Sequence, residues 1–245
     1  MNNYDIIGIE EIRDGSGSSI QKLMEKINSG GSEYSYVISE RLGRTSSKEQ
    51  YAYIFNTGTV ELLGNPVTYP EPFGTDPFHR EPYIASFQSK KGIFNATFVT
   101  IHTDPDEAKE EIDALYDVCE YSKNLRSVDE NIIIMGDFNA DGSYFDENGF
   151  TPLKKPGYMW LIGNEEDTTT RSTKYTYDRI VLTKNDFYIG ESGVFRYDTK
   201  YDLTDSTTQA VSDHYPVYAV FSTGNNNDYT YAPEENKDLN RQTVT

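Results

Sequence analysis

The sequence predicts an α/β sandwich, in which sheets pack face to face and helices cover them. Short apolar segments of strand length recur along most of the 245-residue chain. Two other segments place apolar residues at helical spacing. Because an apolar sheet face must pack against another layer, this mixture of many strands with two helices favours a layered sandwich.

Turn residues and apolar periodicity define the predicted elements. The first helix has apolar residues at helical spacing from Ile20 to Ile27 and ends at a Gly-Gly pair. The second, from Ala108 to Cys119, follows an Asp-Pro start signal. Loops are indicated over residues 65–77 and, at greater length, before residue 180. Strands are predicted over residues 4–9, 34–39, 51–56, 59–63, 83–88, 93–100, 132–135, 180–183 and 217–221.

Composition limits the functions that the chain can have. Its 40 acidic and 22 basic residues give a net charge of −18, which argues against nucleic-acid binding by bulk electrostatic attraction. The same acidity suits a site that meets a polyanion through divalent cations and a few placed arginines. No apolar run is long enough to span a bilayer, and a single cysteine, Cys119, excludes an internal disulfide framework. One domain is expected at residues 1–222, followed by a polar, disordered tail at 223–245.

The most informative segment is NIIIMGDFNAD, at residues 131–141. Its apolar stretch has the length of a buried strand and ends at a glycine. Asp137 and Asn139 follow two residues apart, and alternation along an extended chain directs both toward one face. A carboxylate suits a hard cation and a carboxamide donates to an oxyanion, a combination that suits metal-assisted attack on a phosphate ester. The same residues are also ordinary in a turn that closes a strand.

Two of the three histidines occur at strand ends beside acidic residues. His102 follows the strand at 93–100, and His214 precedes the strand at 217–221. A single histidine in such a position is more often a structural residue. Two of them, together with Asp137 and Asn139, favour general acid and base catalysis.

Acidic residues lie at the ends of several predicted strands. Glu11 ends the first strand and is a candidate cation ligand, whereas Glu10 is expected to alternate onto the opposite face. The other acids in such positions are Glu49, Asp178 and Asp213. Each alone is more often a surface carboxylate or a cap, but side chains that converge from several strand ends are typical of sites built over sheets.

These residues lie in segments that resemble deoxyribonuclease I, within the endonuclease/exonuclease/phosphatase superfamily. The similarity runs from about residue 4 to residue 222. It is carried by the segments YDIIGIEEIRD (4–14), YVISERLGR (36–44), SKEQYAYIF (47–55), REPYIASF (80–87), IHTDPDEAKEEIDALYDV (101–118), GDFNADGSY (136–144), DTTTRSTKYTYDRIVL (167–182) and VSDHYPV (211–217). The resemblance implies two stacked mixed β-sheets flanked by helices. It also implies hydrolysis of DNA phosphodiester bonds with Mg²⁺ or Mn²⁺, aided by Ca²⁺.

The resemblance implies a role for each residue of the catalytic centre. His102 and His214 match catalytic histidines, with Glu49 and Asp178 as their respective carboxylate partners. The cation-side acids are Glu11, Asp137 and Asp213, and the phosphate-side residues are Asn139, Tyr144 and Tyr177. The implied mechanism is in-line attack by an activated water, with a histidine protonating the leaving 3′ oxygen.

Further residues match DNA-binding and calcium-binding positions. Arg13 matches a minor-groove contact and Arg80 a contact near phosphate, while a surface ion pair is the alternative for both arginines. Structural calcium is implied in two loops, one with Asp167, Thr169 and Thr173, and the other with Asp76, Glu81 and the backbone of Phe78.

The sequence departs from the family pattern in several places. The family begins with a further strand that carries a catalytic asparagine, then a helix, ahead of the segment that matches Tyr4. We expect the absence of this strand to leave neighbouring strands with unpaired backbone groups. Arg171 replaces a threonine of the first calcium loop, and Gly142 and Tyr175 stand where the family has its main disulfide.

Three functions stay open. The first is a divalent-cation-dependent endodeoxyribonuclease that leaves 5′-phosphate ends with low sequence specificity. The second is a non-catalytic calcium- or protein-binding relative, and the third is a phosphoesterase that acts on another phosphate ester. Actin is a partner of some vertebrate members through residues matching 36–40, but the bulky Tyr83 at the neighbouring edge argues against it here. The chain is expected to be a monomer, and only the family resemblance suggests secretion.

Overall fold

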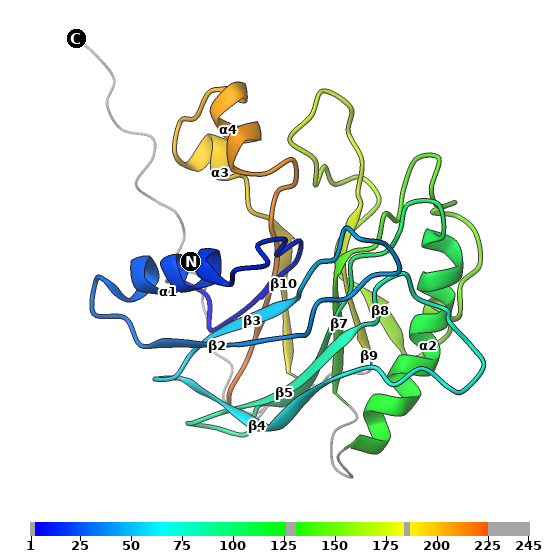
Figure 1. Cartoon of the computed structure of the whole chain (residues 1–245), viewed down its shortest axis with the longest axis horizontal. Coiled ribbons are helices and arrows are strands. Elements are labelled where there is room, and N and C mark those ends of the chain that lie inside the picture. The colour runs from blue at the N-terminus through cyan, green and yellow to red at the C-terminus, as the bar shows by residue number, and fades with distance from the viewer. Residues whose placement is uncertain (1–2, 126–130, 184–186, 225–245) are drawn as a thin grey trace.

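The computed structural model describes residues 3–125, 131–183 and 187–224, and it contains two stacked layers of β-structure flanked by helices (Figure 1). The larger layer is one sheet of six strands in the order β4-β5-β6-β7-β9-β8. Within it β6 and β7 are parallel and the other neighbours are antiparallel, so the sheet is mixed. Its strands are β4 (Val60–Thr68), β5 (Tyr83–Ser89), β6 (Asn95–Thr100), β7 (Ile132–Asp137), β8 (Tyr158–Trp160) and β9 (Asp178–Thr183).

The second layer consists of two smaller antiparallel sheets, ordered β1-β3-β2 and β10-β11. Aromatic side chains fill the space between the layers. The ring of Tyr53 in β3 lies 5.7 Å from that of Phe87 in β5 and 6.3 Å from that of Phe98 in β6. This shared core confirms the predicted sandwich. The strands are β1 (Ile6–Ile9), β2 (Tyr34–Ile38), β3 (Ala52–Asn56), β10 (Tyr188–Val194) and β11 (Val217–Phe221).

The two longer helices cover the outer faces of the two layers, on opposite sides of the molecule in Figure 1. Ile20 and Met24 of α1 pack with Ile54 of β3, and Leu115 and Cys119 of α2 pack on the six-stranded sheet. Both helices were predicted from their periodicity, and Cys119 lies in the core as expected. No helix within the described ranges is both long and apolar enough to span a bilayer. The helices are α1 (Ser18–Asn28), α2 (Ala108–Leu125), α3 (Tyr197–Lys200) and α4 (Asp205–Val211), with one 3₁₀ turn, η1 (Pro152–Lys154).

The elements that the sequence did not predict depend on pairing across the fold. β4 continues through Pro66, where a loop was predicted, because β4 is an edge strand and a register shift between Leu63 and Val67 accommodates the proline. β10 contains two glycines and a glutamate and owes its strand conformation to pairing with β11. β8, α3 and α4 were also left as loop. Residues 225–245, most of the predicted tail, lie outside the described residues.

Two strands of the second layer are packed less completely than the rest. Within the described residues, β1 pairs only with β3 and β11 only with β10, so each has one edge without a partner strand. Every residue of both strands is half-buried although most are apolar, whereas four of the five residues of β3 are fully buried. Such apolar, half-exposed strands are what an unpaired edge produces.

The topology brings dispersed segments together at one edge of the large sheet. β6 and β7 are parallel, so the residues after Thr100 and after Met135 emerge side by side. β9 runs antiparallel to β7 and begins at Asp178, directly opposite Asp137. A bridge between Thr169 and His214 adds the segment before β11. His102, Asp137 and Asp178 are therefore placed by this end of the large sheet. Glu11, Glu49 and the segment with Asp213 and His214 reach the same place from the second layer.

Candidate active site

The first histidine pair joins His102, just after β6, to Glu49. Their Nδ1 and Oε2 atoms are 2.9 Å apart, and the buried carboxylate also lies 2.9 Å from Arg13 and 3.7 Å from Arg80. Burial opposes ionisation of Glu49, but the hydrogen bond to His102 and the positive charges of His102 and Arg80 outweigh it and lower its pKa to about 2. Glu49 is thus a carboxylate that fixes one nitrogen of His102 and leaves Nε2 for chemistry.

The second pair joins His214 to Asp178, with Nδ1 and Oδ2 2.7 Å apart. Burial favours the neutral ring, but the hydrogen bond and charge of Asp178, followed by the charges of Asp137 and Asp213, raise the pKa of His214 to about 10. The surrounding carboxylates therefore stabilise an imidazolium at this position.

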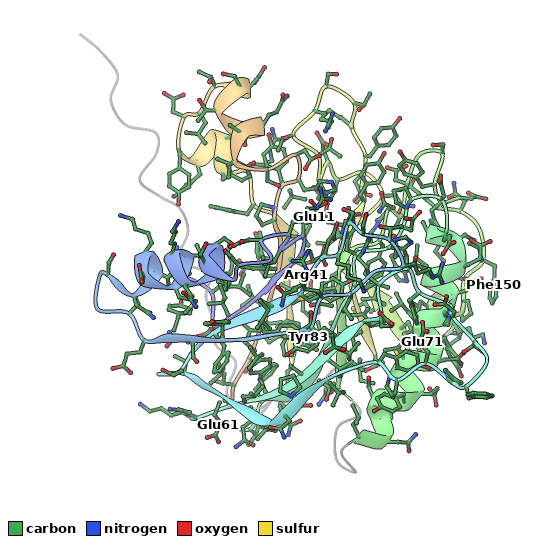
Figure 2. All side chains as sticks on the ribbon, in the orientation of Figure 1. Glu11, Arg41, Glu61, Glu71, Tyr83 and Phe150 are labelled. Carbon is green, nitrogen blue, oxygen red and sulfur yellow. The ribbon has the colours of Figure 1, made fainter. Side chains whose placement is uncertain are left out.

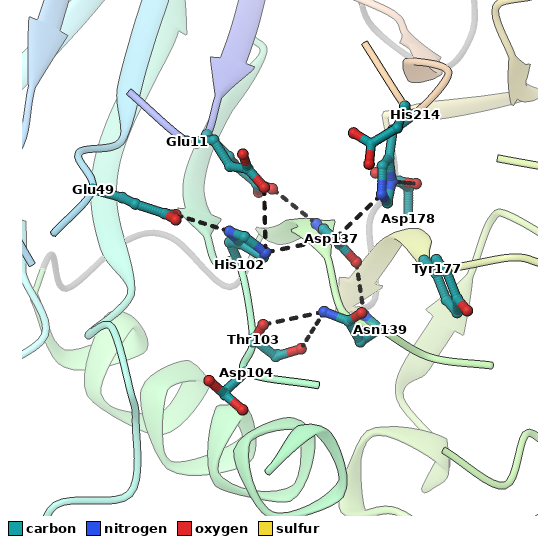
Figure 3. Close-up of polar contacts among 12 residues, drawn as sticks. Glu11, Glu49, His102, Thr103, Asp104, Asp137, Asn139, Tyr177, Asp178 and His214 are labelled. Atoms are coloured by element: carbon teal, nitrogen blue, oxygen red, sulfur yellow. Dashed lines mark hydrogen bonds and ion pairs between the residues drawn. The ribbon is translucent and has the colours of Figure 1, made fainter. Parts of the chain in front are cut away.

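One carboxylate oxygen lies between the two pairs. Asp137 Oδ2 is 3.7 Å from His102 Nε2 and 3.7 Å from His214 Nε2 (Figure 3). Burial and the nearby charge of Asp178 raise the pKa of Asp137 to about 6, against the opposing effect of the two histidines. The free nitrogens of both histidines therefore face one common position, which is what a reaction using two proton-transferring groups requires.

Asn139 is held beside Asp137 by main-chain geometry. Its backbone N–H donates to Asp137 Oδ1 at 2.8 Å, and its side-chain amide donates to the Thr103 carbonyl at 3.1 Å. The residue has a φ of 47°, a left-handed conformation that asparagine tolerates better than most residues. The amide lies beside Asp137 and Thr103 (Figure 3), and its contact with phosphate stays a prediction.

The sequence interpretation of Glu10 was wrong. Its Oε2 accepts a hydrogen bond from the Asp137 backbone N–H at 3.1 Å, so the side chain points into the site instead of away from it. Glu10 follows the alternation of β1, because Ile6 and Gly8 on the same face also point toward the large sheet. Glu11 is the residue that leaves the pattern, since its φ of 55° turns its side chain toward the same site. Burial, followed by the charge of Asp137, raises the pKa of Glu10 well above its usual range. The only sequence signal was the presence of two consecutive acids after the strand.

The site fits a hard divalent cation on one side of His102. Donor atoms of Glu11, Glu49 and His102 lie within 4.8 Å of one another, but the two arginines beside Glu49 repel a cation there. On the other side of His102, Glu11 Oε1 lies 3.8 Å and Asp137 Oδ2 lies 3.7 Å from its Nε2 atom. Two carboxylates around one position, with Glu10 buried behind them, match the oxygen ligands that magnesium and manganese prefer.

Asp213, the third predicted cation ligand, is engaged differently. Its carboxylate lies 3.0 Å from the guanidinium of Arg171, on the His214 side of the site. The structure therefore brings Glu11 and Asp137 to one position and pairs Asp213 with an arginine.

Comparison with known proteins shows the family to which the chain belongs. The profile of the Endonuclease/Exonuclease/phosphatase family matches residues 1–214. Deoxyribonuclease-1 of Equus caballus is 38% identical over 230 residues, which cover 89% of this chain and 80% of that protein. Deoxyribonuclease gamma of Mus musculus is 38% identical over 226 residues, which cover 87% of this chain and 73% of that protein. The chain belongs to the deoxyribonuclease I family.

Solved structures of low sequence identity resemble this chain in fold. A mannosyl-6-phosphatase of Bacteroides thetaiotaomicron superposes with a TM-score of 0.57 at 17% identity, over 90% of this chain and 86% of the other. The catalytic domain of human Nocturnin has a TM-score of 0.57 at 14% identity, over 90% of this chain and 82% of the other. Both support the sandwich architecture.

Where the deoxyribonuclease I family pattern implies a disulfide, this chain has an aromatic contact. A Cβ atom on Gly142 would lie 2.9 Å from the ring of Tyr175, so the ring rests directly on the glycine. Tyr175 stacks on Tyr177 with centroids 5.1 Å apart, and Tyr177 in turn lies 5.7 Å from Tyr144 and 6.0 Å from His214. Tyr177 is thus beside the second histidine pair and Tyr144 is beside Tyr177, and the contact of both with phosphate stays a prediction.

The two predicted DNA-binding arginines have different environments. Arg13 is largely exposed and pairs with Glu11 at 3.2 Å as well as with Glu49, so it lies at the rim of the site. Arg80 is buried and donates to the carbonyls of His102 and Thr103, each at 3.0 Å. Arg80 therefore positions the His102 segment, and its contact with DNA phosphate stays a prediction.

The first predicted calcium loop gathers oxygen atoms. Asp167 Oδ1 accepts hydrogen bonds from the backbone and hydroxyl of Thr169, and that hydroxyl lies 2.7 Å from the Thr173 carbonyl. These oxygens are suitable calcium ligands. Binding of calcium there stays a prediction, with Arg171 in the same loop.

The second predicted calcium loop contains a residue that the sequence interpretation missed. Glu71 accepts a hydrogen bond from the Phe78 backbone at 3.1 Å, and burial, then the charges of Asp76 and Glu81, act to raise its pKa. Asp76 also pairs with Arg44 at 3.0 Å. Several carboxylates whose charges raise the pKa of one of them fit a cation site, which stays a prediction.

The argument against actin does not hold. Tyr83 is 5% exposed and stacks on Tyr53 with ring centroids 5.7 Å apart, so it lies inside the molecule, whereas Phe150 stands at the outer edge (Figure 2). A buried side chain cannot obstruct a partner. Tyr83 therefore gives no argument for or against actin binding.

Proposed function

We propose that this protein is a divalent-cation-dependent endodeoxyribonuclease. It hydrolyses DNA phosphodiester bonds with low sequence specificity and leaves 5′-phosphate ends. The observation that carries the proposal is the position of Asp137 Oδ2, 3.7 Å from the Nε2 atoms of two carboxylate-bound histidines. Membership of the deoxyribonuclease I family supports a nuclease hydrolase, and the relatives named deoxyribonuclease support DNA as the substrate.

The chemistry follows from what each side chain can do at that position. One histidine accepts a proton from the attacking water through Nε2, and the other donates a proton to the leaving 3′ oxygen. Glu49 and Asp178 hold the rings in the required tautomer and stabilise the positive charge that each ring acquires. Asn139 donates to a phosphate oxygen. A divalent cation held by Glu11 and Asp137 would offset the negative charge that develops on the phosphate.

Low sequence specificity fits contacts to the DNA backbone and minor groove rather than to base edges in the major groove. Contact of Arg13 with the DNA backbone or minor groove, where base readout is degenerate, is supported by its exposed position beside Glu11. With a net charge of −18, the chain needs such placed cations to hold DNA at all.

A plasmid-nicking assay tests the proposal. Supercoiled plasmid is expected to become nicked circles in Mg²⁺ plus Ca²⁺ and to stay intact in chelator. The product ends are expected to be religated by DNA ligase without prior phosphorylation, which requires a 5′ phosphate. His102→Ala and His214→Ala are each expected to slow nicking by at least about 100-fold, while Lys22→Ala, on the exposed face of α1, leaves it unchanged.

Contrary results would separate the alternatives. A folded protein that binds Ca²⁺ in calorimetry but cuts no DNA would be a non-catalytic relative. Faster turnover of a small phosphate ester than of plasmid would indicate a phosphoesterase with another substrate. Nicking that persists in both histidine variants would rule out the mechanism.

A further inference from the structure

Arg171 lies at the mouth of the site, and the mechanism above gives it no role. Its guanidinium is 3.0 Å from the Asp213 carboxylate, and the two side chains are 68% and 53% exposed. An ion pair this exposed contributes little to folding stability. Among the described residues its side chain makes one hydrogen bond, from Nη2 to Asp213, so most of its donors can meet another anion.

The main chain around Arg171 is nevertheless fixed relative to His214. The backbone N–H of Thr170 donates to the Asp213 carbonyl at 2.9 Å, and its hydroxyl donates to the Ser212 carbonyl at 3.0 Å. The preceding residue, Thr169, forms a β-bridge with His214 itself. The arginine is thus presented from a segment that is tied on both sides of the catalytic histidine.

Arg171 and Arg13 occupy equivalent places on the two sides of the reaction centre. Arg13 is 59% exposed and pairs with Glu11 and with Glu49, the partner of His102. Arg171 pairs with Asp213, the immediate neighbour of His214. Since both histidines face Asp137, one exposed guanidinium flanks the central carboxylate on each side.

This arrangement matches a strand of nucleic acid that crosses the site. A phosphodiester cut between the two histidines is followed in each direction by another phosphate. A guanidinium binds phosphate oxygens through two parallel hydrogen bonds, and it is the side chain best suited to do so. On a chain of net charge −18, a placed arginine is also the main source of local attraction.

We propose that Arg171 binds a DNA backbone phosphate adjacent to the scissile one, on the His214 side. The proposal rests on the proposed function, because it takes DNA as the substrate. In the free protein Asp213 keeps the guanidinium in place, and on binding the phosphate takes up the remaining donors. Arg171 then contributes to affinity for the polymer without reading its sequence.

The test is the salt dependence of binding to a 20-base-pair duplex, measured by fluorescence anisotropy in the His102→Ala background so that the duplex stays intact. Arg171→Ala is expected to weaken binding several-fold. It is also expected to reduce the slope of log K against log salt by about 0.9, the value of one lost phosphate contact. Arg171→Lys is expected to restore the slope, and both effects are expected to be equal on two duplexes of different sequence. Lys22→Ala removes the same charge from α1 and is the matched control, with slope and affinity unchanged.

Specific results would overturn the proposal. If Arg171→Ala left both the slope and the affinity unchanged, Arg171 would make no contact with DNA phosphate. Tighter Mn²⁺ binding in calorimetry together with unweakened DNA binding would mean that Arg171 only blocks Asp213. A duplex that does not bind at all would remove both this proposal and the proposed function. Binding that depends on Arg171 in a protein whose parent cuts no DNA would remove the proposed function alone.

Discussion

The two histidine pairs share one geometry but have opposite electrostatic surroundings. In the first, Glu49 is 3% exposed and lies beside Arg13 and Arg80, so the charge of the acid is stabilised. In the second, His214 is 26% exposed and is surrounded by Asp178, Asp137 and Asp213, so the charge of the histidine is stabilised.

The difference shows how one motif can serve two purposes. A carboxylate neutralised by arginines holds its histidine mainly through a hydrogen bond. Asp178 is one of several acids around His214, and their combined charge favours the protonated ring, which is the form that can donate a proton. The two pairs meet only at Asp137, so most changes should affect them unequally.

The largest effect is expected where the pairs share a support. Gly136 has a φ of 141°, and a Cβ atom there would lie 2.0 Å from the Ile101 carbonyl and 2.1 Å from Glu10 Oε1. Gly136→Ala should therefore displace the end of β7 and with it Asp137. We expect a loss of about 3 kcal/mol or more in unfolding free energy, measured in urea, and loss of nicking. Gly30→Ala, where the added atom meets open space, is the control, and equal stability in the two variants would contradict the prediction.

Replacing the carboxylate of each pair by its amide should lower the stability of the protein by different amounts in the two pairs. Glu49→Gln leaves the buried Arg80 and its neighbour Arg13 without their shared anion, so we expect a stability loss of about 3 kcal/mol. Asp178→Asn removes a more exposed acid from a cluster of like charges, and a loss of about 1 kcal/mol is expected. Nicking should fall about 1,000-fold in both, because either amide favours the wrong tautomer. Similar urea midpoints for the two variants would remove the distinction.

The pairs should also respond at opposite ends of the pH scale. The pKa of Glu49 is about 2 when folded and 4.5 when unfolded, so its contribution is complete above pH 4.5 and is lost as the pH falls through 2. That contribution is about 3 kcal/mol. The pKa of His214 is about 10 when folded and 6.5 when unfolded, so its contribution is complete below pH 6.5 and is lost as the pH rises through 10. Compared with the parent, the urea midpoint should depend less on pH at the acid end in Glu49→Gln and at the alkaline end in His214→Gln. A variant whose midpoint differs from that of the parent by the same amount at every pH would contradict the prediction for that pair.

What the sequence could predict depended on whether local pattern or tertiary contact decides the structure. Strand length, apolar periodicity and the family resemblance were sufficient for the sandwich and for bringing His102, His214 and Asp137 together. Alternation was not sufficient for placing Glu10 and Glu11 relative to each other, because the left-handed conformation of Glu11 brings its side chain to the same site as that of Glu10. The pairing of β10 with β11 is likewise invisible locally, since it depends on a segment far along the chain.

Glu71 and Glu111 were missed for a related reason. Glu71 lies in a loop, and its contact with the Phe78 backbone forms only when the loop folds back on itself. Glu111 lies on an amphipathic helix, where an acid is ordinarily exposed. Only the tertiary structure shows that Glu111 is fully buried beneath the loop that follows His102.

Glu111 provides the smallest and most selective test, on the first pair only. Its Oε1 accepts hydrogen bonds from the backbones of His79 and Asp104, both at 3.1 Å, while its Oε2 is buried without a hydrogen-bond partner among the described residues. Burial raises its pKa to about 7, above the unfolded value of 4.5, so the neutral form is favoured in the fold. Its stabilising effect is therefore complete below pH 4.5 and is lost as the pH rises through 7, a change of up to about 3 kcal/mol.

Glu111→Gln cannot ionise and keeps the oxygen acceptor, so its urea midpoint relative to the parent should be higher at pH 8 than at pH 5. Glu110→Gln, on the exposed face of the same helix, should show no such difference between the two pH values. If the two variants behave alike, Glu111 is ionised in the fold and a buried cation or water must satisfy it.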